Sequence, residues 1–178
     1  MSVETGERQW RMINGYREAA DLLVAQTELR PYLASNLIYP AIFSYRHSLE
    51  LHLKYLLGAH GSLAGEAPDF TSHRFKDLWP RCRRLIKLFA QGCEPSALKD
   101  LEAVGARIVE FDSVDPNSYS FRFAQNTRGQ PIRLQLNTID LPNLRTIVAS
   151  LHNFLECADL GMTCRRERAN DALEYSCL

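Results

Sequence analysis

The residues best suited to chemistry in this chain are its histidines and the arginine close to one of them. Imidazole gains and loses protons near neutral pH, which makes histidine a common acid–base group in enzymes. Arg46 and His52 are separated by five residues in a segment with helical periodicity. At 100° per residue they flank an apolar stripe centred on Leu49, Arg46 about 60° to one side and His52 about 60° to the other. The spacing indicates two polar groups that can meet a ligand or a partner helix at the border of the stripe.

The same segment has a simpler structural interpretation. Glu50 follows Arg46 by four residues and precedes Lys54 by four. Opposite charges at this spacing form ion pairs on a helix surface, each worth about 0.2–0.5 kcal/mol. In that case the segment is a ladder of surface ion pairs, and His52 is an ordinary residue at the edge of the core.

The spacing of potential ligands does not favour a metal site. Ligands on one helix usually lie three or four residues apart. His47 and Glu50 have this spacing, but one such pair does not make a metal site. The carboxylates of Glu110, Asp112 and Asp115 are more typical of a solvated acidic loop than of a metal centre. We therefore expect no metal and no cofactor.

Several widespread motifs are absent from the sequence. It contains no phosphate-binding loop, no Gly-x-Gly-x-x-Gly fingerprint, no Gly-x-Ser-x-Gly elbow and no His-Glu-x-x-His pair. The common kinase, dehydrogenase, hydrolase and zinc-protease interpretations therefore have no support. The five cysteines include no Cys-x-x-Cys pair, which excludes a zinc ribbon and favours a reducing compartment.

Composition and charge are those of an ordinary globular protein. The chain has 178 residues, 46% of them hydrophobic and 24% charged, so we expect one compact domain. Basic and acidic residues number 21 each, so no protein-wide field attracts polyanions or membranes. The longest uncharged run, residues 31–45, is too short to span a membrane, and the N-terminus lacks the apolar region of a secretory signal. We therefore expect a cytoplasmic protein with no membrane partner.

Helical periodicity covers most of the chain and positions the segment around Arg46. Apolar residues recur every three or four positions over residues 10–29, 40–58, 75–89, 95–111 and 140–158. Pro40 predicts a regular helix start, Pro80 a kink or a restart, and Gly161 the end of the last helix.

Residues 119–136 alternate with period two on either side of a turn at 126–129, which predicts a β-hairpin. We therefore predict an all-α fold, a helical bundle of about five helices with a small β-hairpin insertion. Residues 1–160 form its single domain, and residues 161–178 form a C-terminal tail that is helical or frayed.

Three segments resemble those of HEPN domains (higher eukaryotes and prokaryotes nucleotide-binding). In the first, residues 46–54, Arg46 and His52 match the R-x(4–6)-H motif. The others are residues 72–79 and 111–123, and the resemblance spans roughly residues 35–160. HEPN domains are all-helical bundles, often homodimeric, in toxin–antitoxin and phage-defence systems.

The resemblance implies a metal-independent endoribonuclease of toxin or phage-defence type that cleaves RNA by attack of a ribose 2′-hydroxyl. It implies that His52 is the general acid or base and that Arg46 clamps the phosphate. His47 would orient the phosphate or donate a second proton. A homodimer would join two copies of the site in one cleft, and an antitoxin or another defence protein would be the partner.

One departure from the family supports an alternative function. In many HEPN ribonucleases the motif lies late in the domain, whereas here it lies in the second predicted helix. The alternative is a non-catalytic HEPN-like module that binds a nucleotide or a partner protein.

RNA would also need a positive surface. Around the helix at 75–89 a single acid, Asp77, stands among six cations, which is typical of a phosphate-binding surface and equally of a solvated helix face. Arg122 extends this cluster, whereas Phe121 and Phe123 favour a hydrophobic face over base stacking. The candidate RNA-binding residues are Arg74, Lys76, Arg81, Arg83, Arg84 and Arg122, with Lys87 beside them.

Overall fold

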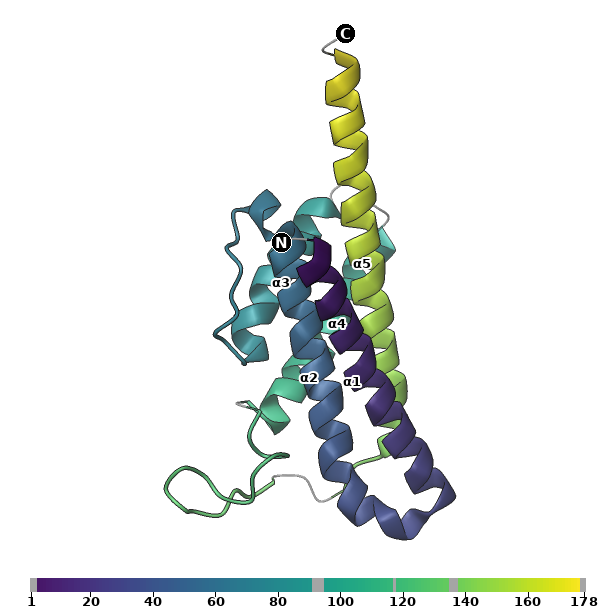
Figure 1. The fold of residues 1–178 in the computed structure, drawn as a ribbon, viewed down its shortest axis with the longest axis vertical. Coiled ribbons are helices and arrows are strands. Elements are labelled where there is room, and N and C mark those ends of the chain that lie inside the picture. Colours follow the sequence, from purple (N-terminus) through teal and green to yellow (C-terminus); the bar gives the residue numbers. More distant parts are fainter. Residues whose placement is uncertain (1–2, 91–94, 117, 135–137, 177–178) are drawn as a thin grey trace.

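The computed structural model describes residues 3–90, 95–116, 118–134 and 138–176, which form an all-α bundle (Figure 1). The long helices within these ranges are α1 (Val3–Leu29), α2 (Ala34–His60), α3 (Phe75–Phe89), α4 (Pro95–Val114) and α5 (Leu141–Ser176). Short 3-10 helices, Pro31–Leu33 and Gly61–Ala64, follow α1 and α2. The predicted all-helical bundle is confirmed. Within the described ranges no helix is both long and apolar enough to cross a membrane.

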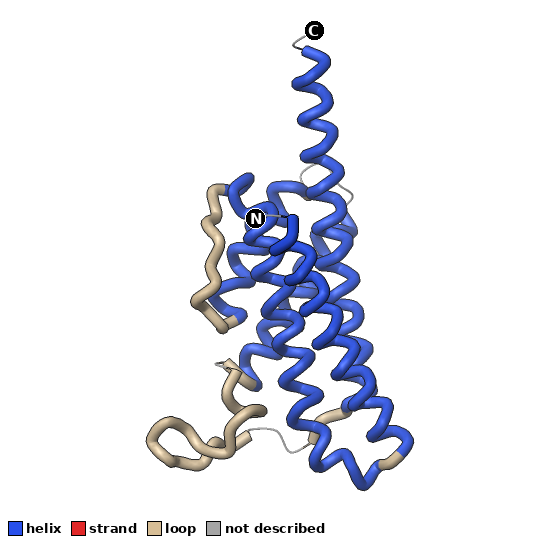
Figure 2. Tube along the Cα trace, viewed as in Figure 1, coloured by secondary structure: helices blue, strands red, loops and turns tan. Residues whose placement is uncertain are grey.

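Helix α2 is the central element of the bundle. It forms a long antiparallel hairpin with α1 and also packs against α3 and α5 (Figures 1 and 2). Its apolar residues Tyr45, Leu49, Leu53 and Leu56 are at most 1% exposed. Because α2 is enclosed by other helices, polar side chains on it must find partners inside the protein.

Two prolines lie inside helices rather than at their starts. Pro40 is within α2 and Pro80 is within α3, and both helices continue through them. A proline inside a helix frees the carbonyl four residues earlier. Both prolines and the residues four positions before them, Asn36 and Lys76, are exposed, so water can satisfy those carbonyls. The predicted start at Pro40 is therefore wrong, and so is the restart of a helix at Pro80, one of the two alternatives for that residue.

The expected β-hairpin is not seen among the described residues. Its turn forms, but a single antiparallel bridge joins Gln125 to Pro131. Pro131 has no N–H with which to extend the ladder. On the other side, the N–H groups of Arg122 and Phe123 both donate to the Tyr119 carbonyl, which coils the first expected strand into a turn. The end of the second expected strand lies outside the described residues.

Helix α5 continues through Gly161 instead of ending there. Glycine in a helix costs about 1 kcal/mol relative to alanine. Met162, the next residue, is 1% exposed and belongs to the core, so this turn of α5 stays attached to the bundle. Beyond Met162 the helix projects past the end of the bundle (Figure 1). The described part of the C-terminal tail is therefore a helical continuation of α5.

Candidate functional site

One face of α2 looks toward two connecting segments, residues 65–74 after α2 and residues 115–123 after α4. The side chains on this face are four, three and four positions apart, a spacing that aligns them along the helix. His52 lies about 180° away, on the opposite side of α2. The stripe on this face consists of Phe43, His47, Glu50 and Lys54.

Arg46, beside the stripe, is fully buried and joins α2 to both connecting segments. Its Nε donates to the Asp115 carbonyl at 2.9 Å, and its Nη2 donates to the His73 carbonyl at 2.9 Å. Its Nη1 donates to Oε2 of Glu50 at 3.3 Å, and its guanidinium carbon lies 4.5 Å from the centroid of the Phe75 ring. The three segments that resemble HEPN domains are thus brought together at this side chain.

Glu50 is one of two buried anions at this junction; the other is Asp115, whose Oδ2 lies 3.9 Å from Nε of Arg46. Glu50 is 1% exposed, and its Oε1 accepts hydrogen bonds from Lys54 Nζ at 2.9 Å and from His73 Nδ1 at 2.8 Å. Lys54 also donates to the Phe70 carbonyl at 3.3 Å. Burial opposes ionisation of Glu50, but the hydrogen bonds from Lys54 and His73 outweigh it and lower the pKa of Glu50. The expected ladder from Arg46 to Lys54 is present, but it is buried rather than on the surface.

A tight turn after α4 directs Arg122 toward the stripe. Oδ1 of Asp115 accepts hydrogen bonds from the N–H groups of Tyr119 at 2.9 Å and Ser120 at 3.0 Å. Ser118 has a φ of 58°, which is unusual for a residue other than glycine. Its carbonyl accepts a hydrogen bond from Nε of Arg122 at 2.6 Å. The turn therefore fixes the base of the guanidinium while leaving the side chain exposed.

Arg122 is surrounded by aromatic rings. Its guanidinium carbon lies 5.4 Å from the ring centroids of Phe43 and Tyr119 and 5.3 Å from that of Phe123. His47 stacks on Phe43 with 5.5 Å between ring centroids. Tyr16 of α1 meets His47 edge-on, and Tyr119 and Phe123 are half exposed. We name this set the Arg122 surface: Tyr16, Phe43, His47, Tyr119, Arg122 and Phe123.

The Arg122 surface borders the buried junction. His47 of this surface and Glu50 of the junction are three residues apart on α2, so the two lie along one face of the helix. Burial is the main cause that lowers the pKa of His47, which leaves this ring neutral at neutral pH. Within the part of the chain that the structure describes, Arg122 forms no ion pair. The side chain of His73, which bonds to Glu50 of the junction, is 62% exposed.

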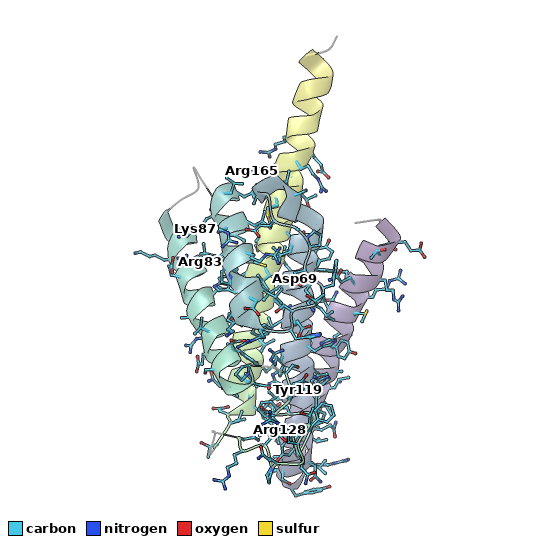
Figure 3. The ribbon with its side chains drawn as sticks, turned by 90° about the vertical axis from the view of Figure 1, so that its left-hand side faces the viewer. Asp69, Arg83, Lys87, Tyr119, Arg128 and Arg165 are labelled. Carbon is cyan, nitrogen blue, oxygen red and sulfur yellow. The ribbon has the colours of Figure 1, made fainter. Side chains whose placement is uncertain are left out.

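The sequence contains one signal for this surface, but the density of positive charge favoured the cluster on the helix at 75–89 instead. Between Pro116 and Ile139 there is no aspartate or glutamate, and the segment holds three arginines. In Figure 3, Tyr119 and Arg128 of this segment lie toward the end of the molecule opposite the C-terminus. The arginines are Arg122, Arg128 and Arg133.

His52 lies in the core on the side of α2 that faces α1 and α5. It is fully buried, and its Nδ1 is 2.9 Å from Nδ1 of His152 on α5. Nε2 of His152 is 2.9 Å from Oγ of Ser48, which donates its own proton to the Tyr45 carbonyl at 2.8 Å. Trp10 of α1 packs edge-on against the His52 ring.

The direction of these hydrogen bonds fixes the protonation of both rings. Because Ser48 uses its proton on the backbone, it accepts a hydrogen bond from His152, which in turn accepts one from His52. Nε2 of His52 is buried with no hydrogen-bond partner in the described ranges. Burial is the main cause that lowers the pKa of both histidines to about 3. The structure does not bring His52 together with Arg46, and both side chains are shielded from solvent.

The cationic cluster expected on α3 is largely neutralised. Acids from the loop after α2 and from α4 pair with three of its arginines: Arg81 with Glu66 and Asp69, Arg84 with Glu66, and Arg83 with Glu102. These acids are distant from α3 in the sequence, whereas Asp77 is the acid that the sequence places next to its cations. Lys76 is exposed and forms no ion pair within the described ranges, whereas Nε of Arg74 is buried and has no hydrogen-bond partner there. Figure 3 shows Arg83 and Lys87 well away from Tyr119.

Comparisons with models of protein families, with curated proteins and with solved structures gave no match. Among the described residues, no three histidine, cysteine, aspartate or glutamate side chains gather in a way that would hold a metal ion.

The buried histidine pair predicts a loss of stability in acid. In the unfolded chain imidazole titrates near pH 6.5, whereas His52 and His152 in the fold titrate at about 3. Their contribution is therefore fully present above about pH 6.5 and is lost as the pH falls toward 3. Each histidine adds a slope of up to about 1.4 kcal/mol per pH unit, so the pair adds at most about 2.8 kcal/mol per pH unit. Urea unfolding at a series of pH values measures this slope.

The matched control for the pH series replaces both histidines by leucine, His52→Leu with His152→Leu. This variant keeps the carboxylates that also titrate in acid, so the difference between the two slopes belongs to the histidine pair. Equal slopes for wild type and variant between pH 6.5 and 4.5 would contradict the prediction.

Removal of the Arg46 charge is expected to cost far more than removal of an exposed ion pair. Arg46→Met leaves Glu50 and Asp115 each with one fewer cationic partner and two carbonyls without this donor, so the free energy of unfolding falls by about 3–5 kcal/mol. Arg145→Met is the control, because Arg145 pairs with Glu28 at the surface and its loss costs about 1 kcal/mol or less. Urea unfolding followed by circular dichroism compares them, and equal losses would show that the junction does not support the fold.

Proposed function

We propose that this HEPN-like protein binds unpaired RNA at the Arg122 surface. The observation that supports the proposal is a guanidinium among half-exposed rings, with no ion pair in the described part of the chain. Bases stack on aromatic side chains and on guanidinium planes, and a guanidinium also donates to phosphate oxygens. Only unpaired nucleotides present their base faces in this way, so a single strand fits better than a duplex.

The charge of the segment around Arg122 favours the same ligand. Three arginines without an acid between residues 116 and 139 make a local positive field on a protein whose net charge is zero. Such a field raises the rate of encounter with a polyanion and makes binding dependent on salt.

Arg46 and His52 act as structural residues in this proposal. Both are fully buried, and they bond to different groups on different sides of α2. A phosphate cannot reach either side chain without opening the core. This placement favours a binding module over a ribonuclease that uses this pair.

The other properties that the HEPN resemblance implies stay predictions. They are a homodimer, an antitoxin or defence protein as partner, and a cytoplasmic location. Light scattering on the purified protein measures the first of these, since a homodimer has twice the 20.3 kDa mass of one chain.

The binding proposal predicts a specific effect of Arg122. We expect a short fluorescent oligouridine to bind the wild type, and Arg122→Gln to weaken that binding about tenfold, because both a phosphate contact and the support of the stacked rings are lost. The slope of log affinity against log salt should fall by about 0.7, the value for one phosphate contact on a single strand. Fluorescence anisotropy measures both quantities.

Arg11→Gln is the matched control for Arg122→Gln. Arg11 is exposed on α1 and pairs with Glu7, so its replacement removes one charge of the same kind outside the Arg122 surface. If both variants weaken the binding of oligouridine equally, the effect of Arg122→Gln is due to net charge alone. No binding of oligouridine or of mixed-sequence RNA by the wild type at low salt would overturn the proposal and favour a protein partner for the exposed rings.

A further inference from the structure

We propose that RNA held at the Arg122 surface continues along α2 to a second stacking site, which Tyr39 and Tyr32 form near the turn between α1 and α2. This inference rests on the RNA binding proposed above and deepens it. It assigns the ligand class as single strands long enough to reach both sites, and it places the strand along one face of α2.

The stripe on α2 continues past Phe43 toward the start of the helix. Tyr39 lies four residues before Phe43, which places it about one turn further along the same face. Tyr39 is half exposed, and its ring centroid lies 6.5 Å from that of Phe121. Phe121 directly precedes Arg122, so the Tyr39 ring adjoins the turn that holds Arg122. The Arg122 surface is therefore continuous with Tyr39.

Tyr32 extends the same row of rings to the end of the bundle. The 3-10 helix Pro31–Leu33 leads directly into α2, and seven residues, about two turns, separate Tyr32 from Tyr39. Asn36, between them on this face, is exposed, and Tyr32 is 75% exposed. Single exposed hydrophobic residues are common on protein surfaces, but here exposed rings follow one another along one face. Such a row offers successive stacking positions to the bases of one strand.

Positive charge accompanies this row of rings. No aspartate or glutamate lies between Glu28 and Glu50 in the sequence, and Glu28 is held in an ion pair at the surface. Arg30, at the turn between α1 and α2, is exposed and forms no ion pair among the described residues. Residues 118–134, with three arginines and no acid, lie at the same end of the molecule (Figure 1). Rings combined with unpaired cations are the features that bind single strands.

The opposite direction along the stripe is less suited to a polyanion. There Lys54 is already bonded to the buried carboxylate of Glu50. On the neighbouring helix α3, Arg81 is bonded to Glu66. A phosphate would have to compete with these carboxylates for both cations. One ring on that side, Phe70, is 59% exposed, and the Phe70 carbonyl accepts a hydrogen bond from Lys54. Phe70 is therefore the contrasting residue for a test of the direction.

The distance between the two sites sets the length of strand that reaches both. Phe43 and Tyr32 are eleven residues apart, which corresponds to about 16 Å along the helix axis at 1.5 Å per residue. Nucleotides stacked as in a duplex strand rise about 3.4 Å each. Six stacked nucleotides thus span about 17 Å. We infer that a strand of about six nucleotides is the shortest that occupies the Arg122 surface and Tyr32 together.

The test compares the binding of fluorescent hexauridine to wild type and Tyr32→Ser by fluorescence anisotropy. We expect Tyr32→Ser to bind about tenfold more weakly, because one base loses the ring on which it stacks. Tyr32→Phe, which keeps the ring, should restore binding to within about twofold of wild type. Circular dichroism checks that each variant folds. Equal losses in the serine and phenylalanine variants would overturn the inference, because the contact would then be made by the hydroxyl group.

Phe70→Ser is the matched control. Phe70 is an exposed ring like Tyr32 but lies on the other side of the Arg122 surface, so its replacement should leave the binding of hexauridine unchanged. Weaker binding by Phe70→Ser together with unchanged binding by Tyr32→Ser would show that the strand runs in the opposite direction, which overturns the inference.

Removal of bases from the RNA identifies the end of the strand that reaches Tyr32. Two further hexanucleotides keep every phosphate but lack the last two bases at either the 5′ or the 3′ end. One of them should bind about tenfold more weakly than the complete strand to wild type, but less than about twofold more weakly to Tyr32→Ser, which no longer has the ring. Equal losses in both proteins for both strands would overturn the inference, because no base would then depend on Tyr32.

The remaining outcomes separate this inference from the proposed function. Weaker binding of hexauridine by Arg122→Gln, with no effect of Tyr32→Ser, overturns the second site and leaves binding at the Arg122 surface standing. No binding of hexauridine by the wild type at low salt overturns both.

Discussion

The fold is organised around the buried positive charge of Arg46. A guanidinium removed from water needs an anion and acceptors for its N–H groups. Helix α2 supplies only Glu50, and the other acceptors come from residues 27 and 69 positions further along the chain. Both connecting segments therefore contact α2 at the same side chain, Arg46. The turn that holds Arg122 begins at one of these two acceptors, Asp115, and the other acceptor, His73, also contacts Glu50 through its ring.

Two histidines of the chain show how the same side chain is placed in opposite environments. His52 and His73 each use Nδ1 in a hydrogen bond, one to a neutral imidazole and the other to a carboxylate. His52 is fully buried and stays neutral, so it contributes to packing between α2 and α5. His73 keeps most of its ring in solvent. Exposure and the charge of the partner, rather than a motif, distinguish a group that can exchange protons with a ligand.

Local patterns were enough to predict the helices but not the environment of their polar residues. The periodicity located all five helices, and the four-residue spacing of Arg46, Glu50 and Lys54 predicted their pairing. Whether that pairing is buried depends on His73 and Asp115, which no local pattern connects to it. The alternation of residues 119–136 failed as a signal for strands because a strand also needs a partner with free N–H groups. The α3 cluster failed because its counter-ions come from elsewhere in the chain.

Two of the three segments that meet at Arg46 are recognised through their main chain. Arg46 donates to the carbonyl oxygens of His73 and Asp115, and every amino acid has such an oxygen. These two hydrogen bonds do not depend on which side chains stand at positions 73 and 115, although the ring of His73 and the carboxylate of Asp115 add contacts to Glu50 and Arg46. A protein built in this way can change the chemistry that its loops present to a ligand while its architecture stays the same. Side chains on these segments that do not contact Arg46 or Glu50, such as Arg122 and Tyr119, are then free to vary without loss of the main-chain anchor.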